Sequence, residues 1–142
     1  MTTVRQLLDE KGHNVITVGS DETVFDAIRK MAEKNIGSLV VCESTKVIGI
    51  ITERHYVRNV FLEGRALPST RVGDVMETPV LFARPDLTAE ECMAVMIDKR
   101  VRHLPVIDEG KLIGIISIGD LVKNIISDHK FTIDQLTHYL QA

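Results

Sequence analysis

A hydroxyl, a glycine and a carboxylate stand together in the segment Ile116-Ser-Ile-Gly-Asp-Leu121, where a predicted strand passes into a predicted helix. The free backbone N–H groups at the start of a helix favour a phosphate. The Ser117 hydroxyl can add a donor, and Gly119 lets a ligand approach the backbone. Asp120 can accept hydrogen bonds from two vicinal hydroxyls, as an acidic residue does for a ribose in dinucleotide-binding folds. Together these groups could bind a phosphorylated ribose.

The same segment also has the form of a helix cap. In a capping box, Ser117 is the N-cap residue and Asp120 is the third helical residue, and each side chain accepts a hydrogen bond from the backbone N–H of the other. The spacing fits both interpretations, so binding and capping both remain open at this point.

A second segment of the same form, Ile51-Thr-Glu-Arg-His-Tyr56, keeps the hydroxyl at Thr52 but has His55 at the position of the carboxylate. A neutral imidazole has one acceptor nitrogen and is therefore a poorer partner for a diol. A protonated imidazole could attract a phosphate instead. The two segments therefore predict two sites with different chemistry.

A basic cluster, Lys99-Arg-Val-Arg-His103, opens a predicted strand in the second half of the chain. Lys99 and Arg100 fit the end of a helix, where cations interact favourably with the dipole. Arg102 and His103 already lie in the strand and fit that explanation less well. The corresponding place in the first half holds Ile36-Gly-Ser38, which is small and uncharged.

A repeat relates the two halves of the chain. Residues 15–60 align with residues 80–125 at a constant offset of 65 and without a gap, and 14 of the 46 pairs are identical. The most similar stretches are 46–52 and 111–117. The chain therefore contains two copies of one sequence motif.

Each copy has the pattern expected of a β-α-β-β-α unit. Its first helix carries one apolar stripe, formed by Val24, Ala27, Ile28 and Met31 in the first copy and by Ala89, Cys92, Met93, Met96 and Ile97 in the second. Asp21 and Asp86 are the predicted N-caps. The predicted strands are 15–18, 39–42 and 47–52 in the first copy and 80–82, 104–107 and 112–117 in the second. The predicted second helices are 53–62 and 119–127.

The two copies, residues 8–64 and 72–130, are expected to be joined by a linker at 65–71 and followed by a C-terminal helix at 131–142. A copy of about 60 residues would be marginally stable alone. The copies should therefore pack through their β-rich faces as an α/β (α+β) fold with pseudo-twofold symmetry, leaving a cleft along the seam. In the tail, one helical face carries Ile133, Leu136, Thr137 and Leu140. These residues would either line the core or contact a second subunit.

The composition excludes several classes of protein. With 17 basic against 20 acidic side chains and a net charge of −3, the 142-residue chain has no basic surplus for nucleic acid. It also has no apolar run of about 18 residues that could cross a membrane, and no secretion signal. Cys42 and Cys92 are expected in the core, and the five histidines lack metal-ligand spacing. The expectation is a cytoplasmic protein that holds no metal.

Gly49–Arg58, Arg102–Ile107 and Gly114–Val122 resemble the motifs of tandem CBS (cystathionine β-synthase) domains. More narrowly, the chain resembles stand-alone bacterial CBS pairs related to the regulatory segment of inosine monophosphate dehydrogenase. The resemblance implies a non-catalytic, homodimeric regulatory module for a partner protein. It also implies that an adenine nucleotide binds between the copies. AMP is the first expectation, followed by ADP or ATP, NAD and S-adenosylmethionine. An interaction domain with vestigial pockets is the alternative.

The resemblance further implies two sets of site residues. The first set consists of Lys11, Val15, Ile16, Thr17, Gly37, Ser38, Ser117, Ile118, Gly119 and Asp120. The second, altered set consists of Thr52, Arg54, His55, Pro79, Val80, Leu81, Arg102 and His103. No nucleophile–base pair or metal cluster can be assembled from the sequence, so no catalytic residue is expected.

Overall fold

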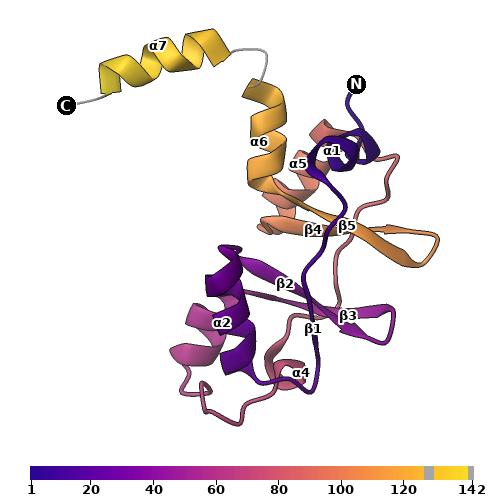
Figure 1. The fold of residues 1–142 in the computed structure, drawn as a ribbon, viewed down its shortest axis with the longest axis vertical. Coiled ribbons are helices and arrows are strands. Elements are labelled where there is room, and N and C mark those ends of the chain that lie inside the picture. Colours follow the sequence, from indigo (N-terminus) through magenta and orange to yellow (C-terminus); the bar gives the residue numbers. More distant parts are fainter. Residues whose placement is uncertain (127–129, 141–142) are drawn as a thin grey trace.

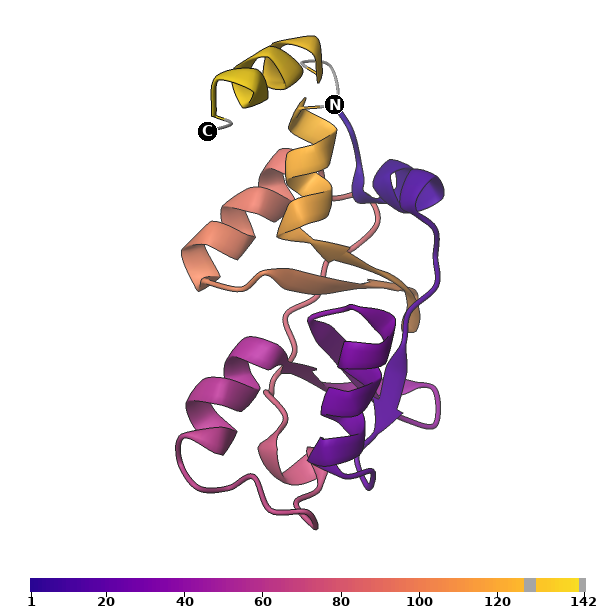
Figure 2. The same ribbon diagram turned by 60° about the vertical axis from the view of Figure 1, so that its left-hand side comes forward.

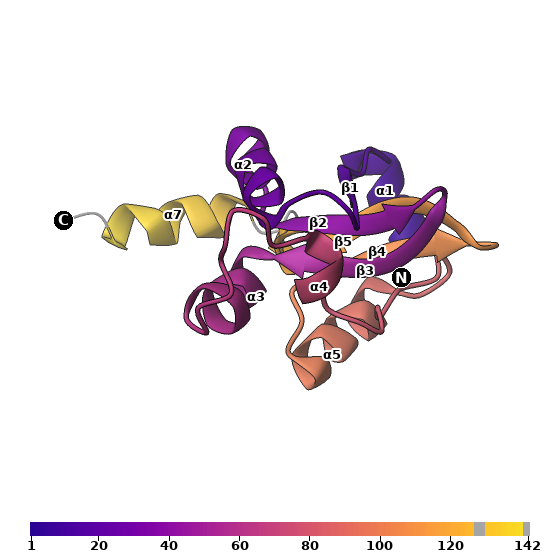
Figure 3. The ribbon, with the colours of Figure 1, turned by 90° about the horizontal axis from the view of Figure 1, so that it is seen from below.

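Two small β-sheets, one from each repeat, lie next to each other in the middle of the molecule, with helices around them (Figure 1). The computed structural model describes residues 1–126 and 130–140. Strands β3 and β5 are in contact across the seam between the repeats. Seen from below, α1 and α2 lie on one side of the strands and α3 and α5 on the other (Figure 3).

The elements follow the repeat. The first half contains α1 (Val4–Lys11), β1 (Thr17–Gly19), α2 (Val24–Lys34), β2 (Ser38–Glu43), β3 (Lys46–Thr52), α3 (Glu53–Tyr56) and a π-helical continuation, η1 (Val57–Phe61). The second half contains α4 (Val72–Val75), α5 (Ala89–Lys99), β4 (His103–Asp108), β5 (Lys111–Ser117), α6 (Ile118–Ile126) and α7 (Lys130–Leu140). Ser127 and residues 141–142, which end two of the predicted helices, lie outside the described residues.

The predicted hairpins are confirmed. In the first sheet β2 pairs with β3 antiparallel and β1 joins β2 in parallel, with Thr17 opposite Val40. In the second sheet β4 pairs with β5 antiparallel, with Leu104 opposite Ile116. The register shifts at Val41/Cys42 and again at Val106/Ile107, which are equivalent positions of the repeat.

The predicted first strands need correction. In the first copy the strand begins two residues later than expected, at Thr17. In the second copy the strand predicted at 80–82 is absent, and Ala83 alone forms a parallel bridge to Val106. Pro79 and Pro85 flank this stretch, and a proline has no N–H group to give to a sheet.

The predicted N-caps were also wrong by two residues. Thr23 and Thr88 cap α2 and α5, and their hydroxyls accept hydrogen bonds from the backbone N–H groups of Asp26 and Glu91, both at 3.1 Å. A cap side chain must reach the N–H group three residues later. Asp21 and Asp86 lie too far before their helices to do this.

Each repeat is completed by the segment that precedes the other repeat. Helix α1, which the sequence analysis did not predict, buries Val4 and Leu8 in the core of the second repeat. Helix α4 buries Val72 and Val75 in the core of the first. Figure 2 shows α1 beside α6, far from the first-repeat helix α2 that follows it in the chain. We call residues 4–11 and 72–76 the lead-in segments.

Two equivalent glycines allow the lead-in segments to approach the strands closely. A Cβ atom on Gly114 in β5 would lie 2.5 Å from Leu8 Cδ2, and a Cβ atom on Gly49 in β3 would overlap the side chain of Met76. Leu8 is fully buried in the core of the second repeat. The glycines are therefore required by packing.

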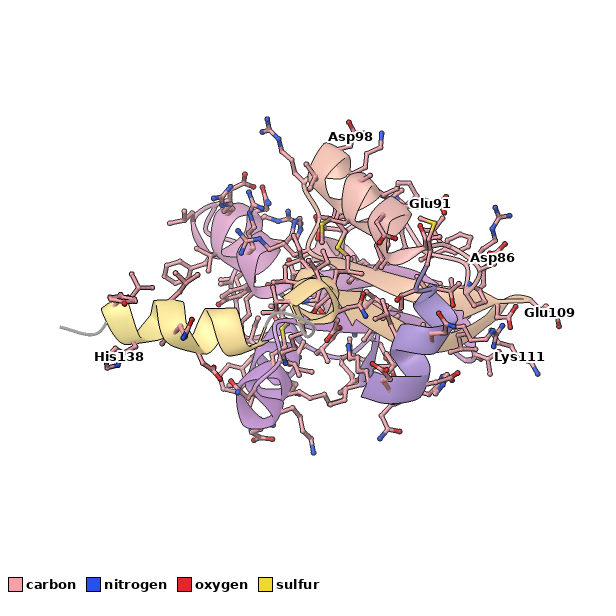
Figure 4. The ribbon with its side chains drawn as sticks, turned by 90° about the horizontal axis from the view of Figure 1, so that it is seen from above. Asp86, Glu91, Asp98, Glu109, Lys111 and His138 are labelled. Carbon is pink, nitrogen blue, oxygen red and sulfur yellow. The ribbon has the colours of Figure 1, made fainter. Side chains whose placement is uncertain are left out.

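Helix α7 extends away from the rest of the molecule, opposite the β4–β5 turn that carries Glu109 and Lys111 (Figure 4). Leu136 and Leu140 are 57% and 83% exposed. The expectation that these two residues line the core of their own chain was wrong. No helix among residues 1–126 and 130–140 is long and apolar enough to cross a membrane.

The two cysteines differ in burial. Cys92 is fully buried in the core of the second repeat, where burial raises the pKa of its thiol to about 11. Cys42 is only half-buried, so the expectation that both lie in the core holds for Cys92 alone. Both thiols are free.

We predict that Gly114→Ala lowers the free energy of unfolding by about 1–3 kcal/mol, because overpacking forces Leu8 or β5 to shift. Denaturant unfolding of the full chain measures the change. The control is Gly119→Ala, because a Cβ there would meet nothing closer than Ser117 Oγ at 3.6 Å and alanine favours a helix. If Leu8→Ala and Gly114→Ala are additive, the two residues do not compete for the same space.

Candidate functional site

A cavity of about 430 Å³ opens at the seam between the two repeats. One wall comes from the first repeat at the junction of β3 and α3, with Thr52 and His55. The other comes from the second repeat at residues 100–103, between α5 and β4. Its volume lies within the range of small-molecule sites.

Five of the eight residues predicted for the second site line this cavity: Thr52, Arg54, His55, Arg102 and His103. Gly37, predicted for the first site, lines it as well. Pro79, Val80 and Leu81 are not among its lining residues and lie on the stretch that leads to the bridge at Ala83.

Sequence reasoning missed four charged residues of the cavity wall, Glu53, Arg58, Arg100 and Glu77. Arg58 lies four residues after Arg54, and this spacing places two side chains on one helical face. Arg100 was noticed but interpreted as an ordinary helix end. Glu77 follows the lead-in segment at 72–76, and no local pattern connects it to the cavity.

The cavity wall is predominantly basic. Four arginines line it, together with two acidic residues, Glu53 and Glu77. Glu77 lies 3.5 Å from the Nδ1 atom of His55. Within the part of the chain that the structure describes, the four guanidinium groups make no ion pair and no hydrogen bond.

Both ring nitrogens of His55 are hydrogen-bonded to other residues of the protein. Its Nε2–H group donates to the Val75 carbonyl oxygen at 2.8 Å, and Asn59 Nδ2 donates to Nδ1 at 3.1 Å. The imidazole therefore has no free acceptor for a diol and instead connects α3 to the lead-in segment at 72–76. Its backbone N–H donates to Thr52 Oγ1 at 3.0 Å, so Thr52 caps α3.

The predicted capping box at the second junction is present. The Asp120 N–H donates to Ser117 Oγ at 3.1 Å, and the Ser117 N–H donates to Asp120 Oδ2 at 2.8 Å. The Ile118 N–H donates to the Arg102 carbonyl at 2.9 Å. A nucleotide-binding role for these residues remains a prediction, and capping does not prevent it.

Lys11, in the lead-in segment at 4–11, binds at the same junction of β5 and α6. Its Nζ donates to Asp120 Oδ2 at 2.6 Å and to the Ile115 carbonyl at 2.7 Å. Burial acts to raise the pKa of Asp120, but the hydrogen bonds from Lys11 and Ser117 outweigh it, so the pKa lies below its ordinary value. These contacts all use Oδ2. In the described residues Asp120 Oδ1 has no hydrogen bond and could accept one from a ligand.

The remaining residues of the first predicted set lie along the chain between α1 and β2. Val15, Ile16 and Thr17 follow α1 as extended backbone, and the Thr17 carbonyl accepts a hydrogen bond from Lys30 Nζ at 3.0 Å. Ser38 begins β2 and is buried. None of these four residues is among those that line the seam cavity.

His103 lies between the two sets of predicted site residues. It lines the seam cavity. Burial lowers its pKa, and the charge of Lys11 lowers it further, while Asp120 acts in the opposite direction. The two sets are therefore close enough to influence each other electrostatically. Among residues 1–126 and 130–140, no group of three or more His, Cys, Asp or Glu side chains could hold a metal ion.

The lowered pKa of Asp120 predicts a dependence of stability on pH. The carboxylate stabilises the fold above its ordinary pKa of 3.8, and this contribution is lost as the pH falls through the lower pKa of the folded state. Asp120→Asn keeps one acceptor oxygen for Lys11 and Ser117 but does not titrate. We expect its free energy of unfolding to fall less steeply than that of the wild type between about pH 5 and pH 2. Equal slopes would show that Asp120 is not stabilised as an anion.

Comparison with known proteins agrees with this architecture. The family model of the CBS domain matches residues 4–61 and 72–127. The CBS domain-containing protein CBSX3, mitochondrial, of Arabidopsis thaliana is 36% identical over 150 aligned positions, which cover 99% of this chain and 73% of that protein. The inosine-5'-monophosphate dehydrogenase of Methanocaldococcus jannaschii is 39% identical over 112 positions, which cover 78% of this chain but 21% of that enzyme.

Solved structures show the same fold. A candidate signal-transduction protein with CBS domains from Burkholderia ambifaria has a TM-score of 0.85 and 48% identity, covering 89% of this chain and 96% of its own. A CBS domain pair in complex with 5'-methylthioadenosine and S-adenosyl-L-methionine has a TM-score of 0.80 and 21% identity, covering 90% and 98%. The predicted fold class and resemblance are confirmed: the chain belongs to the CBS domain family and contains two CBS domains in tandem.

Proposed function

We propose that this CBS pair senses an adenine nucleotide, and that the nucleotide binds at the seam between the repeats. The observation that carries the proposal is the 430 Å³ cavity, whose walls come from both repeats and carry unpaired arginines. A ligand that contacts both walls adds interactions between the two repeats and so changes the free energy with which they pack together. Such a change can be passed to a partner protein.

The neighbouring junction at Ser117–Asp120 supports the proposal. It offers an acceptor at Asp120 Oδ1, and no described residue binds the Gly119 N–H group. The CBS pair that holds two adenosine compounds supports the fold alone at 21% identity. The proposal therefore rests on the residues of this chain.

A dimerising interaction domain with vestigial pockets is the second candidate. It is supported by the capping box and the Lys11–Asp120 ion pair, which engage Ser117 and Asp120 Oδ2 without any ligand. Neither candidate requires catalysis, and we propose that the chain is not an enzyme. AMP is the first nucleotide to test, followed by ADP, ATP, NAD and S-adenosylmethionine.

We expect at least one of these five compounds to raise the melting temperature of the protein. A ligand at 100 times its dissociation constant adds about 2.7 kcal/mol of stability, which a thermal-shift measurement detects. The protein must first be shown to be free of co-purified nucleotide. If none of the compounds changes the melting temperature, the interaction domain is the better explanation.

Asp120→Ala separates binding from capping in the same experiment. If Asp120 holds a ribose, calorimetric titration with the compound that binds should show at least tenfold weaker affinity. Loss of the cap alone costs about 1 kcal/mol of stability and leaves affinity unchanged. Thr88→Ala is the matched control, because it removes the cap of α5, which does not line the cavity.

We propose that the protein is a homodimer whose interface includes the second helices of both repeats. Exposed apolar side chains recur there at equivalent positions, with Val57 48% and Val122 43% exposed. Light scattering at micromolar concentration should give about 32 kDa, twice the chain mass of 15.9 kDa. Val122→Glu should shift the mass towards 16 kDa, whereas Lys111→Glu at the β4–β5 turn should not. A wild-type mass near 16 kDa would contradict the proposal.

A further inference from the structure

We infer that the seam cavity is a polyphosphate site, whose ligand carries at least two linked phosphate groups and is selected by their number. This inference deepens the proposed function, since it names the class of ligand for the same cavity. Four arginines carry it: Arg54 and Arg58 from the first repeat, and Arg100 and Arg102 from the second.

The charge of the cavity is a local property. The whole chain has a net charge of −3, yet four arginines meet at one cavity that contains two acidic residues, Glu53 and Glu77. In the described residues none of the four guanidinium groups has a hydrogen-bonded or ionic partner. Unpaired guanidinium groups lining a cavity at this density favour an anionic ligand.

The other repeat shows that the fold does not require this charge. At the positions equivalent to Arg54, Arg100 and Arg102, the other repeat has Gly119, Asn35 and Gly37. None of these three residues is charged, although both copies form the same hairpin and the same helix ends. Arg54, Arg100 and Arg102 are therefore specific to this end of the seam, whereas Arg58 corresponds to Lys123, which is also basic.

Arg100 gives the clearest case. It is the C-cap of α5 and has a left-handed backbone with φ 56°, just as Asn35 caps α2 with φ 52°. Asparagine is a usual residue in this conformation, whereas a long side chain is uncommon there. The helix end thus tolerates Arg100 but does not need it. The reason for an arginine at this cap lies in the cavity that it lines.

A single phosphate does not account for four arginines. One guanidinium group can contact two oxygens of a phosphate side by side, so one or two arginines suffice for a monophosphate. Here the arginines lie on two walls contributed by different repeats, and a chain of linked phosphates could contact both. Both ring nitrogens of His55 are already bonded to protein, so His55 does not hold a ribose in this cavity.

Calorimetric titration of the full chain tests the inference. The probes are inorganic phosphate, pyrophosphate and tripolyphosphate, followed by AMP, ADP and ATP, all at one ionic strength because such contacts are sensitive to salt. We expect affinity to rise at least tenfold from phosphate to tripolyphosphate and from AMP to ATP. Tripolyphosphate should also displace ATP.

Arg100→Asn is the decisive variant, because it installs the cap residue of the other repeat and so preserves the helix end. It should weaken the binding of tripolyphosphate and of ATP at least tenfold. Arg84→Gln is the control, because it removes the same charge as Arg100→Asn. Arg84 is exposed and lies outside the seam cavity. Arg84→Gln should change neither affinity.

The outcomes separate this inference from the proposed function. If AMP and ATP bind equally well and Arg100→Asn has no effect, the polyphosphate site is wrong and nucleotide sensing stands. If tripolyphosphate binds in an Arg100-dependent manner but no adenine nucleotide does, the site stands and nucleotide sensing fails. If none of the probes binds, the polyphosphate site is overturned, and nucleotide sensing is overturned with it when NAD and S-adenosylmethionine also fail to bind.

Discussion

The structure depends on the burial of each lead-in segment in the core of the opposite repeat. Leu8 packs on Gly114, and Met76 packs on Gly49, at equivalent places in the two sheets. Because neither core is complete without a segment that precedes the other repeat, the two copies cannot separate without exposing apolar side chains. This exchange holds the seam closed and defines the geometry of the cavity within it.

The exchange also determines which residues can reach the two strand–helix junctions. At the second junction Lys11 arrives from one lead-in segment and binds Asp120. At the first, the Val75 carbonyl arrives from the other segment and accepts from His55. His55 and Asp120 occupy the same position of the repeat, and each bonds to a lead-in segment. Asp120 accepts a hydrogen bond, whereas His55 donates one. A carboxylate with a spare oxygen remains at one end of the seam, and an imidazole with no spare nitrogen remains at the other.

A symmetric backbone therefore carries an asymmetric surface. The repeats share hairpin register, bulge position and left-handed helix caps, which are properties of the backbone. They differ at side chains such as Arg100 and Asn35, which the backbone leaves free to vary. Two binding regions with different preferences can arise in this way from one duplicated unit, as long as the packing glycines are retained.

The sequence by itself determined the repeat, the two hairpins and the apolar helix stripes, because each depends on the spacing of residues along the chain. It offered the cap at Ser117 as one of two interpretations. It also indicated Thr52, Arg54, His55, Arg102 and His103 as site residues. Only the tertiary structure decided the exchange of lead-in segments and the placement of Arg58 and Arg100 on the walls of one cavity. These features depend on residues that are distant in the chain, from Gly49 and Met76, 27 positions apart, to Lys11 and Asp120, 109 positions apart. No local pattern of apolar or charged side chains encodes such contacts.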